Sequence, residues 1–300
     1  MDRVRQSIRT NRRRRTNAPL FGQLLTAAVE SAADAVAVRF NPTGDPADQR
    51  ESTYREFDEA SSRLARVLIG RGCEPGAGVA VRLDRGVDWA VAAWAVLKAG
   101  AALVLLPAHE VPDAPTVPLG LTTGANPNDR IEWLRLDDAA ISAEIAAQSP
   151  RPVTHANRTG VLSGSDPALV IGTTGVRMSY DELATAADHL RVRTGLTFES
   201  RTFQHGWPDS AATLLEVVSA GATGASLVVV PNSDTDLGES LAEEWVTHLI
   251  ADRAALAAID TVRLTDLRAV VLEEGTSAEV DVPELAEIVP LNELLPVVSS

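Results

Sequence analysis

The sequence predicts an α/β fold built from two packed subdomains of alternating strands and helices, with largely parallel sheets. Short apolar segments typical of buried strands alternate with amphipathic segments of helical period, first within residues 36–106 and again from residue 168. The connections between them are short, as in parallel sheets covered by helices. The 300 residues are 45% hydrophobic and 23% charged, which allows a sizeable core and excludes wholesale disorder.

In the first block, the best-defined element is the helix after Thr53. We expect Thr53 to be its N-cap, with Glu56 three residues later completing a capping box. Gly70–Gly72 are expected to end this helix. The other elements of this block are predicted from the spacing of apolar residues alone. The expected helices are 21–31 and 87–97, and the expected strands are 36–40, 78–83 and 101–106.

Prolines punctuate residues 107–165, and only 131–136 and 139–147 have the pattern of regular elements. We expect this stretch to bridge two lobes. The alternation then returns. The expected strands are 168–172, 202–205, 225–231, 247–251 and 267–272; the expected helices are 179–193, 209–220, 237–244 and 253–259; a further unit begins at 282. We therefore divide the chain into a flexible arm or linker (1–18), a first subdomain with the Pro-rich bridge (19–165) and a second subdomain (166–300).

The distribution of basic residues is unusual, since 26 of the 27 are Arg and the one lysine is Lys98. The first 15 residues hold seven Arg and one Asp, a net charge of +6, which leaves −20 for the remaining 285. A body this acidic repels nucleic-acid phosphates, and the arm is too short for a nucleic-acid domain. Lys98 comes just before a helix stop at Gly100, where a lysine interacts favourably with the helix dipole, and we interpret it as structural rather than catalytic.

Several classes of protein are disfavoured by the residues present. Cys73 is the single cysteine, and the five histidines lack zinc-binding spacing. Neither a G-x-S-x-G nucleophile turn nor a G-x-G-x-x-G dinucleotide turn occurs. The longest apolar run, 89–108, contains Lys98 and is better interpreted as a helix, a stop and a buried strand than as a membrane span. These observations predict a cytoplasmic protein with no membrane segment.

Residues 53–107 resemble the start of adenylate-forming enzymes, and most closely the adenylation domains of nonribosomal peptide synthetases. Thr53–Phe57 matches the T-Y-x-E-L pattern, and Leu97–Pro107 matches L-K-A-G followed by a proline. The resemblance extends with gaps over residues 20–280 and implies the fold of that family's N-terminal lobe. The chain ends at Ser300, before the adenine-binding, ribose-binding and C-terminal-lobe features of the family. We therefore expect a truncated form without that lobe.

The resemblance also places a phosphate-binding loop after residue 171. Gly172, Thr173, Thr174 and Gly175 match part of it, but the Pro-Lys-Gly that ends the family's loop is missing, and Arg177 falls in the following segment. Glycines let backbone N–H groups approach phosphates, and hydroxyls add hydrogen bonds. We interpret 172–175 as a vestigial phosphate loop; a strand-to-helix turn without a ligand explains the same four residues.

Three further positions follow from the resemblance. Ala211 occupies the position of the aspartate that holds a substrate amino group in the family, and Asp209 lies two residues away. The resemblance thus marks Asp209 and Ala211 as the remnant of a substrate pocket, in which Asp209 would replace the missing carboxylate only if the helix start shifted. We interpret Asp209 as a carboxylate at a helix start. We interpret His205 as a histidine at a strand end, with a general base as the alternative. Glu273-Glu274-Gly275 stands where the family has G-G-E. Two adjacent carboxylates suit acid/base chemistry or Mg²⁺ binding, but in an acidic chain we interpret them as a solvated turn.

These observations predict a degenerate adenylation-like domain of nonribosomal peptide biosynthesis that is structural or docking in role, with no catalytic residue, no metal and no cofactor. The stretch 9–25 resembles the connector between a condensation and an adenylation domain, so the implied partners are a condensation or carrier domain. A homodimer is the other expected way to cover surface left by the missing lobe. The alternative is a minimal or split ligase that activates an amino or carboxylic acid with ATP and Mg²⁺.

Overall fold

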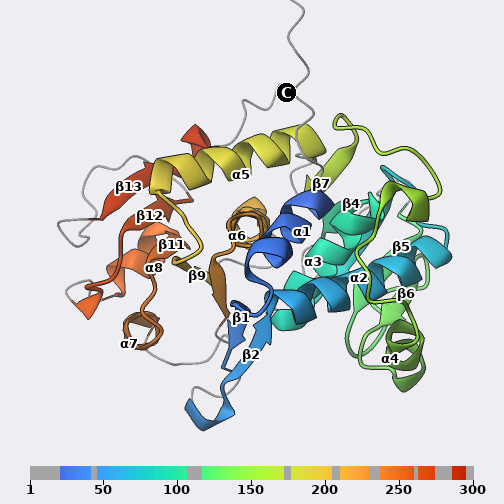
Figure 1. Cartoon of the computed structure of the whole chain (residues 1–300), viewed down its shortest axis with the longest axis horizontal. Helices are drawn as coiled ribbons and strands as arrows, with labels where there is room; N and C mark the ends of the chain where they lie inside the picture. The colour runs from blue at the N-terminus through green and yellow to red at the C-terminus, as the bar shows by residue number, and fades with distance from the viewer. Residues whose placement is uncertain are drawn as a thin grey trace, which may run out of the picture.

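The computed structural model describes residues 21–41, 46–84, 86–106, 117–171, 177–204, 210–229, 237–259, 263–273 and 286–294. These residues form two sheets with helices between them (Figure 1). Sheet A has the strand order β13-β12-β11-β9-β10-β1-β2, and sheet B has the order β6-β5-β3-β4-β7-β8. The predicted α/β class with largely parallel strands is confirmed.

Within sheet A, neighbouring strands pair in parallel except β1 with β2. Its strands are β1 (Val36–Phe40), β2 (Arg50–Thr53), β9 (Arg201–Gln204), β10 (Ser226–Val229), β11 (His248–Ala251), β12 (Ala269–Leu272) and β13 (Glu287–Pro290). The antiparallel β2 ends at Thr53, so it feeds directly into the helix that Thr53 caps.

Within sheet B, the pairing is parallel except for β7 with β8. Its strands are β3 (Gly78–Arg82), β4 (Ala102–Leu105), β5 (Leu119–Thr122), β6 (Glu132–Arg135), β7 (Pro167–Ile171) and β8 (Arg177–Ser179). The division at 165/166 stays a prediction about domains. The sheets do not follow it, because β1 and β2 join the later strands and β7 and β8 the earlier ones.

A layer of helices lies between the sheets. Its members are α1 (Phe21–Ala32), α2 (Tyr54–Gly70), α3 (Val87–Ala99), α5 (Tyr180–Thr194) and α6 (Ala211–Thr223). Helix α6 contacts β9, β10 and β11, α3 contacts β3 and β4, and α3 and α6 contact each other. The shared core contains both large buried tryptophans of α3, Trp89 and Trp94. The two sheets are thus held by one core rather than by two separate ones.

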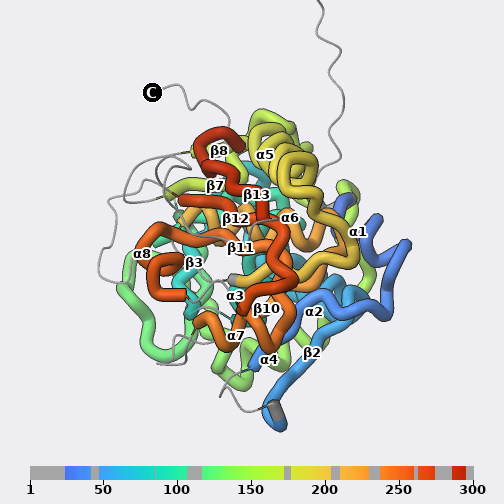
Figure 2. The backbone as a smooth tube through the Cα atoms, turned by 90° about the vertical axis from the view of Figure 1, so that its left-hand side faces the viewer, coloured from blue at the N-terminus to red at the C-terminus, as the bar shows by residue number. Residues whose placement is uncertain are grey.

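The outer face of sheet A is covered by α7 (Leu237–Glu243) and α8 (Arg253–Ala257), which Figure 2 views from their own side. Leu241 of α7 and Leu256 of α8 pack with Leu249 and Leu272 of the sheet in a second apolar cluster. Helix α4 (Ala139–Ala146) lies against α2 at the other end of the molecule. None of the described helices has the length and hydropathy that a membrane crossing requires.

Two buried tyrosines, one from each half of the chain, form hydrogen bonds to the other half. Tyr54 starts α2, and its hydroxyl donates to the carbonyls of Ala220 and Ala225 at distances of 2.9 and 2.7 Å, where α6 ends before β10. Tyr180 starts α5, and its hydroxyl reaches the carbonyls of Leu97 and Ala101, at 3.1 and 2.7 Å, where α3 ends before β4. Burial raises the pKa of both phenols far above the ordinary value.

Replacing either tyrosine by Phe should lower the free energy of unfolding by about 1 kcal/mol, because one buried hydrogen-bonding hydroxyl is lost while its aromatic ring stays packed. The two losses should add, since the tyrosines share no partner. Urea unfolding followed by tryptophan fluorescence measures both. An unchanged unfolding midpoint in Tyr54→Phe and Tyr180→Phe would show that these contacts do not stabilise the fold.

The capping box at Thr53 and Glu56 is confirmed, and a second one forms at Ser179 and Glu182. Three strands were not predicted: β2, β5 and β8. The short β2 and β8 are antiparallel partners of longer parallel strands, and β2 has the polar sequence REST with exposed or half-buried side chains. Strand β5, within the expected bridge, is fully buried and so has no alternating pattern to signal it.

Candidate functional site

The candidate site is the edge of sheet A where its parallel strands end. The carboxyl ends of parallel strands meet at the same edge of a sheet. Here Gln204 of β9 lies beside Val229 of β10. In the same way, Ala251 of β11 lies beside Leu272 of β12. Ligands of open α/β sheets bind outside this edge. Strands β9 and β12, which precede the predicted residues Asp209 and Glu273, end at this edge. Strand β7, which precedes the predicted loop at 172–175, ends at the equivalent edge of sheet B.

Most of those predicted residues fall outside the described part of the chain. Gly172, Thr173, Thr174 and Gly175 follow Ile171, the last residue of β7, and are not among the described residues. The same holds for His205 and Asp209, which follow β9, and for Glu274. The vestigial phosphate loop and the role of Asp209 therefore stay predictions.

Ala211 is described and is the first residue of α6. Its N-cap is Ser210, whose Oγ accepts a hydrogen bond from the backbone N–H of Thr213 at 3.1 Å. The position at which the resemblance implies an aspartate thus carries a half-buried methyl group on a regular helix. At the end of β12, the half-buried Glu273 donates its backbone N–H to the carbonyl of Ala251 at 3.1 Å, which extends the ladder between β11 and β12.

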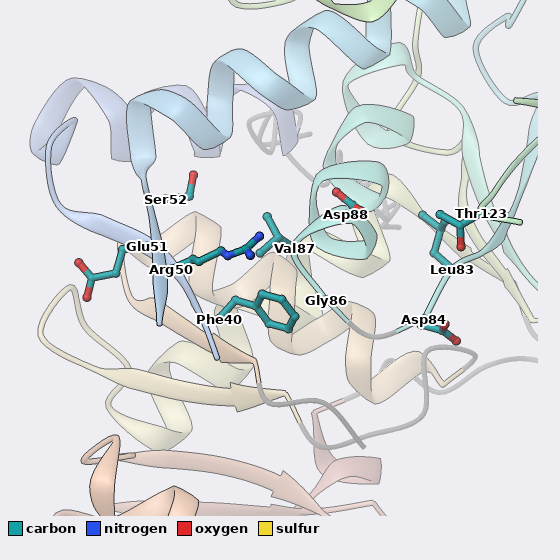
Figure 3. A pocket seen from close by; sticks show the side chains of 10 residues that line it. All are labelled: Phe40, Arg50, Glu51, Ser52, Leu83, Asp84, Gly86, Val87, Asp88 and Thr123. Atoms are coloured by element: carbon teal, nitrogen blue, oxygen red, sulfur yellow. The ribbon is translucent and has the colours of Figure 1, made fainter. Parts of the chain in front are cut away.

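A pocket of about 460 Å³ opens between the carboxyl ends of β1 and β3 (Figure 3). Ten residues line it, namely Phe40, Arg50, Glu51, Ser52, Leu83, Asp84, Gly86, Val87, Asp88 and Thr123. The side chain of Arg50 points across the pocket toward Val87 in the first turn of α3, with the ring of Phe40 below it in this view. No motif in the sequence predicted this pocket, because its residues come from β1, β2, the start of α3 and the segments that follow β3 and β5.

The charges of the pocket are mainly negative. Glu51 is paired with Arg39 at 2.7 Å, and the other charged side chains among the described lining residues are Arg50, Asp84 and Asp88. An excess of carboxylates repels the phosphates of a nucleotide. Among the residues that the structure describes, no group of three or more His, Cys, Asp or Glu is arranged to hold a metal ion.

Lys98 lies away from the pocket, in the last turn of α3, and its side chain is only 1% exposed. Its ammonium forms an ion pair with the Asp58 carboxylate of α2 at 2.6 Å and donates to the hydroxyls of Ser61 and Ser62 at 2.8 and 2.9 Å. Desolvation lowers the pKa of Lys98 to about 8, against the opposing effect of the charge on Asp58. The ammonium therefore stays charged at neutral pH and joins the two helices.

The predicted structural role of Lys98 is confirmed, but its partner is Asp58 rather than the dipole of its own helix. A signal for this pair was present in the sequence. Asp58, Ser61 and Ser62 have the i, i+3, i+4 spacing of one helix face, and all three are buried in an otherwise apolar surface of α2.

His248 is a second buried titratable group. Its Nε2–H donates to the carbonyl of Thr194 at 2.9 Å, and its Nδ1 lies 2.8 Å from the hydroxyl oxygen of Thr247. Burial lowers its pKa, an effect that the hydrogen bond to Thr194 opposes and the charge of Arg268 reinforces. The folded protein therefore holds this imidazole neutral where the unfolded chain would protonate it.

The pH dependence of stability follows from this difference. The ordinary pKa of a histidine imidazole is 6.5, and the pKa of His248 in the folded protein is lower. As pH falls through 6.5, the unfolded chain therefore binds a proton at His248 before the folded protein does. The free energy of unfolding should fall with pH in this range. In His248→Gln this contribution should be absent, and the unfolding midpoint in urea should change less between pH 7.5 and 5.5. His189→Gln, at an exposed histidine, should keep the parent's pH dependence. Equal pH dependence in all three proteins would contradict this account.

The comparisons with known proteins fit this geometry. The model of the AMP-binding enzyme family matches residues 25–116. Novobiocin biosynthesis protein H of Streptomyces niveus is 30% identical over 243 residues, which is 73% of this chain and 40% of that protein. Phosphinothricin tripeptide synthetase PhsC of Streptomyces viridochromogenes is 33% identical over 256 residues, which is 75% of this chain and 22% of that protein. The chain belongs to the adenylate-forming family.

Solved structures show the same fold. The N-terminal subdomain of Klebsiella oxytoca NpsA superimposes with a TM-score of 0.68 at 21% identity, over 85% of this chain and 67% of that one. The nonribosomal peptide synthetase FmoA3 gives a TM-score of 0.72 at 23% identity, over 85% of this chain and 28% of that one. This member of the adenylate-forming family therefore has the fold of an adenylation N-terminal subdomain, and it spans well under half the length of the two sequence relatives above.

Proposed function

We propose that this chain is an adenylation-like module of nonribosomal peptide biosynthesis that acts as a structural or docking domain and does not form acyl-adenylates. The observation that carries the proposal is the position of Lys98. Phosphoryl and adenylyl transfer need cations to stabilise charge on the transferring group. The one lysine of this sequence is enclosed between α2 and α3, with its ammonium bound to Asp58, Ser61 and Ser62.

Two further features support a non-catalytic role. A methyl group, Ala211, stands where the resemblance implies a carboxylate for a substrate amino group. Among the described residues that line the pocket near this edge, the carboxylates Asp84 and Asp88 outnumber the cation Arg50, which disfavours a triphosphate. Catalytic groups that act as a unit are not replaced by one substitution, so losses at several positions together weigh more than any one of them.

The partners that suit this role are the neighbouring domains of a peptide synthetase, a condensation or a carrier domain. The matched relative PhsC is named a tripeptide synthetase, and this chain covers 22% of it. A second copy of the chain is the other candidate. Light scattering during size-exclusion chromatography measures the molar mass and so distinguishes the two. The mass of a dimer would indicate that a second copy of the chain is the partner. The mass of a monomer would favour docking to a condensation or carrier domain.

The alternative is a minimal or split ligase that uses ATP and Mg²⁺ to activate an amino or carboxylic acid. Its support is the identity of 30–33% to the two biosynthetic relatives, spread over about three quarters of the chain. Under this alternative, Gly172–Gly175 would cradle phosphates and Asp209 would replace the missing carboxylate.

Pyrophosphate exchange separates the two functions. We expect no exchange of labelled pyrophosphate into ATP above background with any of the 20 amino acids or a panel of aryl acids, with or without the protein encoded next to this chain. Exchange that depends on one acid, and that Asp209→Asn reduces, would establish the ligase and overturn the non-catalytic proposal. A matched control is Asp129→Asn, at an exposed aspartate outside the pocket.

A further inference from the structure

A small cavity lies inside the molecule, between sheet A and the helices α5 and α6. Residues of α5, α6, β9, β11 and β12 line it, and all of these residues are buried. Thr202 is the second residue of β9, and His248 and Ala269 are the first residues of β11 and β12. The cavity therefore lies toward the amino ends of these strands, at the opposite edge of sheet A from the candidate site.

Buried polar side chains line this cavity. Thr202, Glu216 and His248 are 4%, 2% and 5% exposed. Both ring nitrogens of His248 are already engaged, with Thr194 and Thr247. The hydroxyl of Thr202 differs, because within the described part of the chain its Oγ1 is buried and has no hydrogen-bond partner. A buried hydroxyl without a partner costs free energy, so a ligand that supplies the missing hydrogen bond is stabilised here.

The size and the chemistry of the cavity fit a water molecule. The centre of a water has about 10 Å³ of room, which is about the space that one buried water needs. The carboxylate of Glu216 supplies acceptor oxygens, and the hydroxyl of Thr202 both donates and accepts. A single water can therefore donate to Glu216 and form a second hydrogen bond with Thr202.

We propose that this cavity binds one water molecule, which bridges the Thr202 hydroxyl of β9 and the Glu216 carboxylate of α6. The bridge satisfies the hydroxyl that the protein itself leaves without a partner. It also joins α6, the helix that begins at Ala211 in the candidate site, to the amino end of the sheet. The proposal holds whether or not the chain activates acids.

A crystal structure of the full chain, at a resolution that shows ordered waters, is the direct test. We expect one water in the cavity, about 2.7–2.8 Å from Thr202 Oγ1, the usual distance between two oxygens that share a hydrogen bond. The same structure of Thr202→Val should lack this water, because one of its partners is gone. A parent structure with no water in the cavity would overturn the proposal.

Unfolding in urea gives a second test, which depends on the direction of the change. Thr202→Val keeps the shape of the side chain but removes a partner of the water, so the equilibrium constant for unfolding should rise about fivefold. Ser219→Ala is the matched control. Its hydroxyl in α6 is also buried without a partner in the described structure, but Ser219 does not line the cavity. Removal of this hydroxyl should leave the constant unchanged or lower it.

Two results of the unfolding experiment would contradict the proposal. A Thr202→Val protein as stable as the parent, or more stable, would show that the hydroxyl of Thr202 has no bound partner to lose. An equal loss of stability in Thr202→Val and Ser219→Ala would show that the cavity makes no difference to the cost of removing a buried hydroxyl.

Discussion

Asp58→Ala is expected to lower the free energy of unfolding by about 3–5 kcal/mol, because it leaves the ammonium of Lys98 buried without its counter-charge. The effect should be large because both side chains are almost fully enclosed, at 5% and 1% exposure. Lys98 would retain the hydroxyls of Ser61 and Ser62 and the carbonyl of Asp58, which do not neutralise a charge. Urea unfolding at pH 7 measures the loss.

A double replacement distinguishes the missing charge from disturbed packing. Asp58→Leu/Lys98→Met removes both charges and fills the space with apolar atoms, and we expect it to recover most of the lost stability, as apolar replacement of buried ion pairs often does. Asp34→Ala breaks an ion pair with Arg55 whose side chains are 88% and 55% exposed, so it should cost less than about 0.5 kcal/mol. A loss in Asp58→Ala as small as that in Asp34→Ala would contradict the structural role of Lys98.

Trp94→Ala should cost a similar amount, about 3–5 kcal/mol, since the indole is fully buried where α3 packs on α6. Its contact partner is a glycine. A Cβ added at Gly221 of α6 would lie only 2.5 Å from Cζ2 of Trp94, so Gly221→Ala should destabilise by about 1–3 kcal/mol through overpacking. Both effects would be seen as lower urea midpoints.

The combination of the two changes is the sharper test of this contact. In the Trp94→Ala background, the new methyl group enters the cavity, so Gly221→Ala should become neutral or stabilising. Gly70→Ala is the matched control, because nothing lies within 4 Å of its added Cβ and alanine favours a helix. Equal penalties for Gly221→Ala in both backgrounds would mean that the two helices do not meet as described.

Much of the fold could be predicted from the sequence, because the signals were local. Thr53 and Glu56 form the expected capping box, and Val36–Phe40 is the expected strand. The pairing of strands distant in sequence could not be predicted. Nothing in the apolar pattern indicates that β1 lies beside β10, or that β7 joins β4. For the same reason the sheets interleave the two halves of the chain, although the sequence pattern suggested consecutive blocks.

The candidate site was less predictable than the fold. The resemblance pointed to loops that follow strand ends, and most of those residues lie outside the described structure. The pocket near Arg50 depends on residues from β1, β2, α3 and the segments after β3 and β5, and only the tertiary structure shows that they meet. One member of the Asp58–Lys98 pair was predicted to be structural, because Lys98 precedes a helix stop. Its partner Asp58 was not predicted, because it lies 40 residues earlier on another helix.

The central claim, that this adenylation-like chain does not activate acids, is tested most directly by calorimetric titration of the full chain with Mg-ATP and with AMP. We expect no saturable heat from either nucleotide up to millimolar concentration. Saturable binding of either nucleotide with a Kd in the micromolar range would contradict the account.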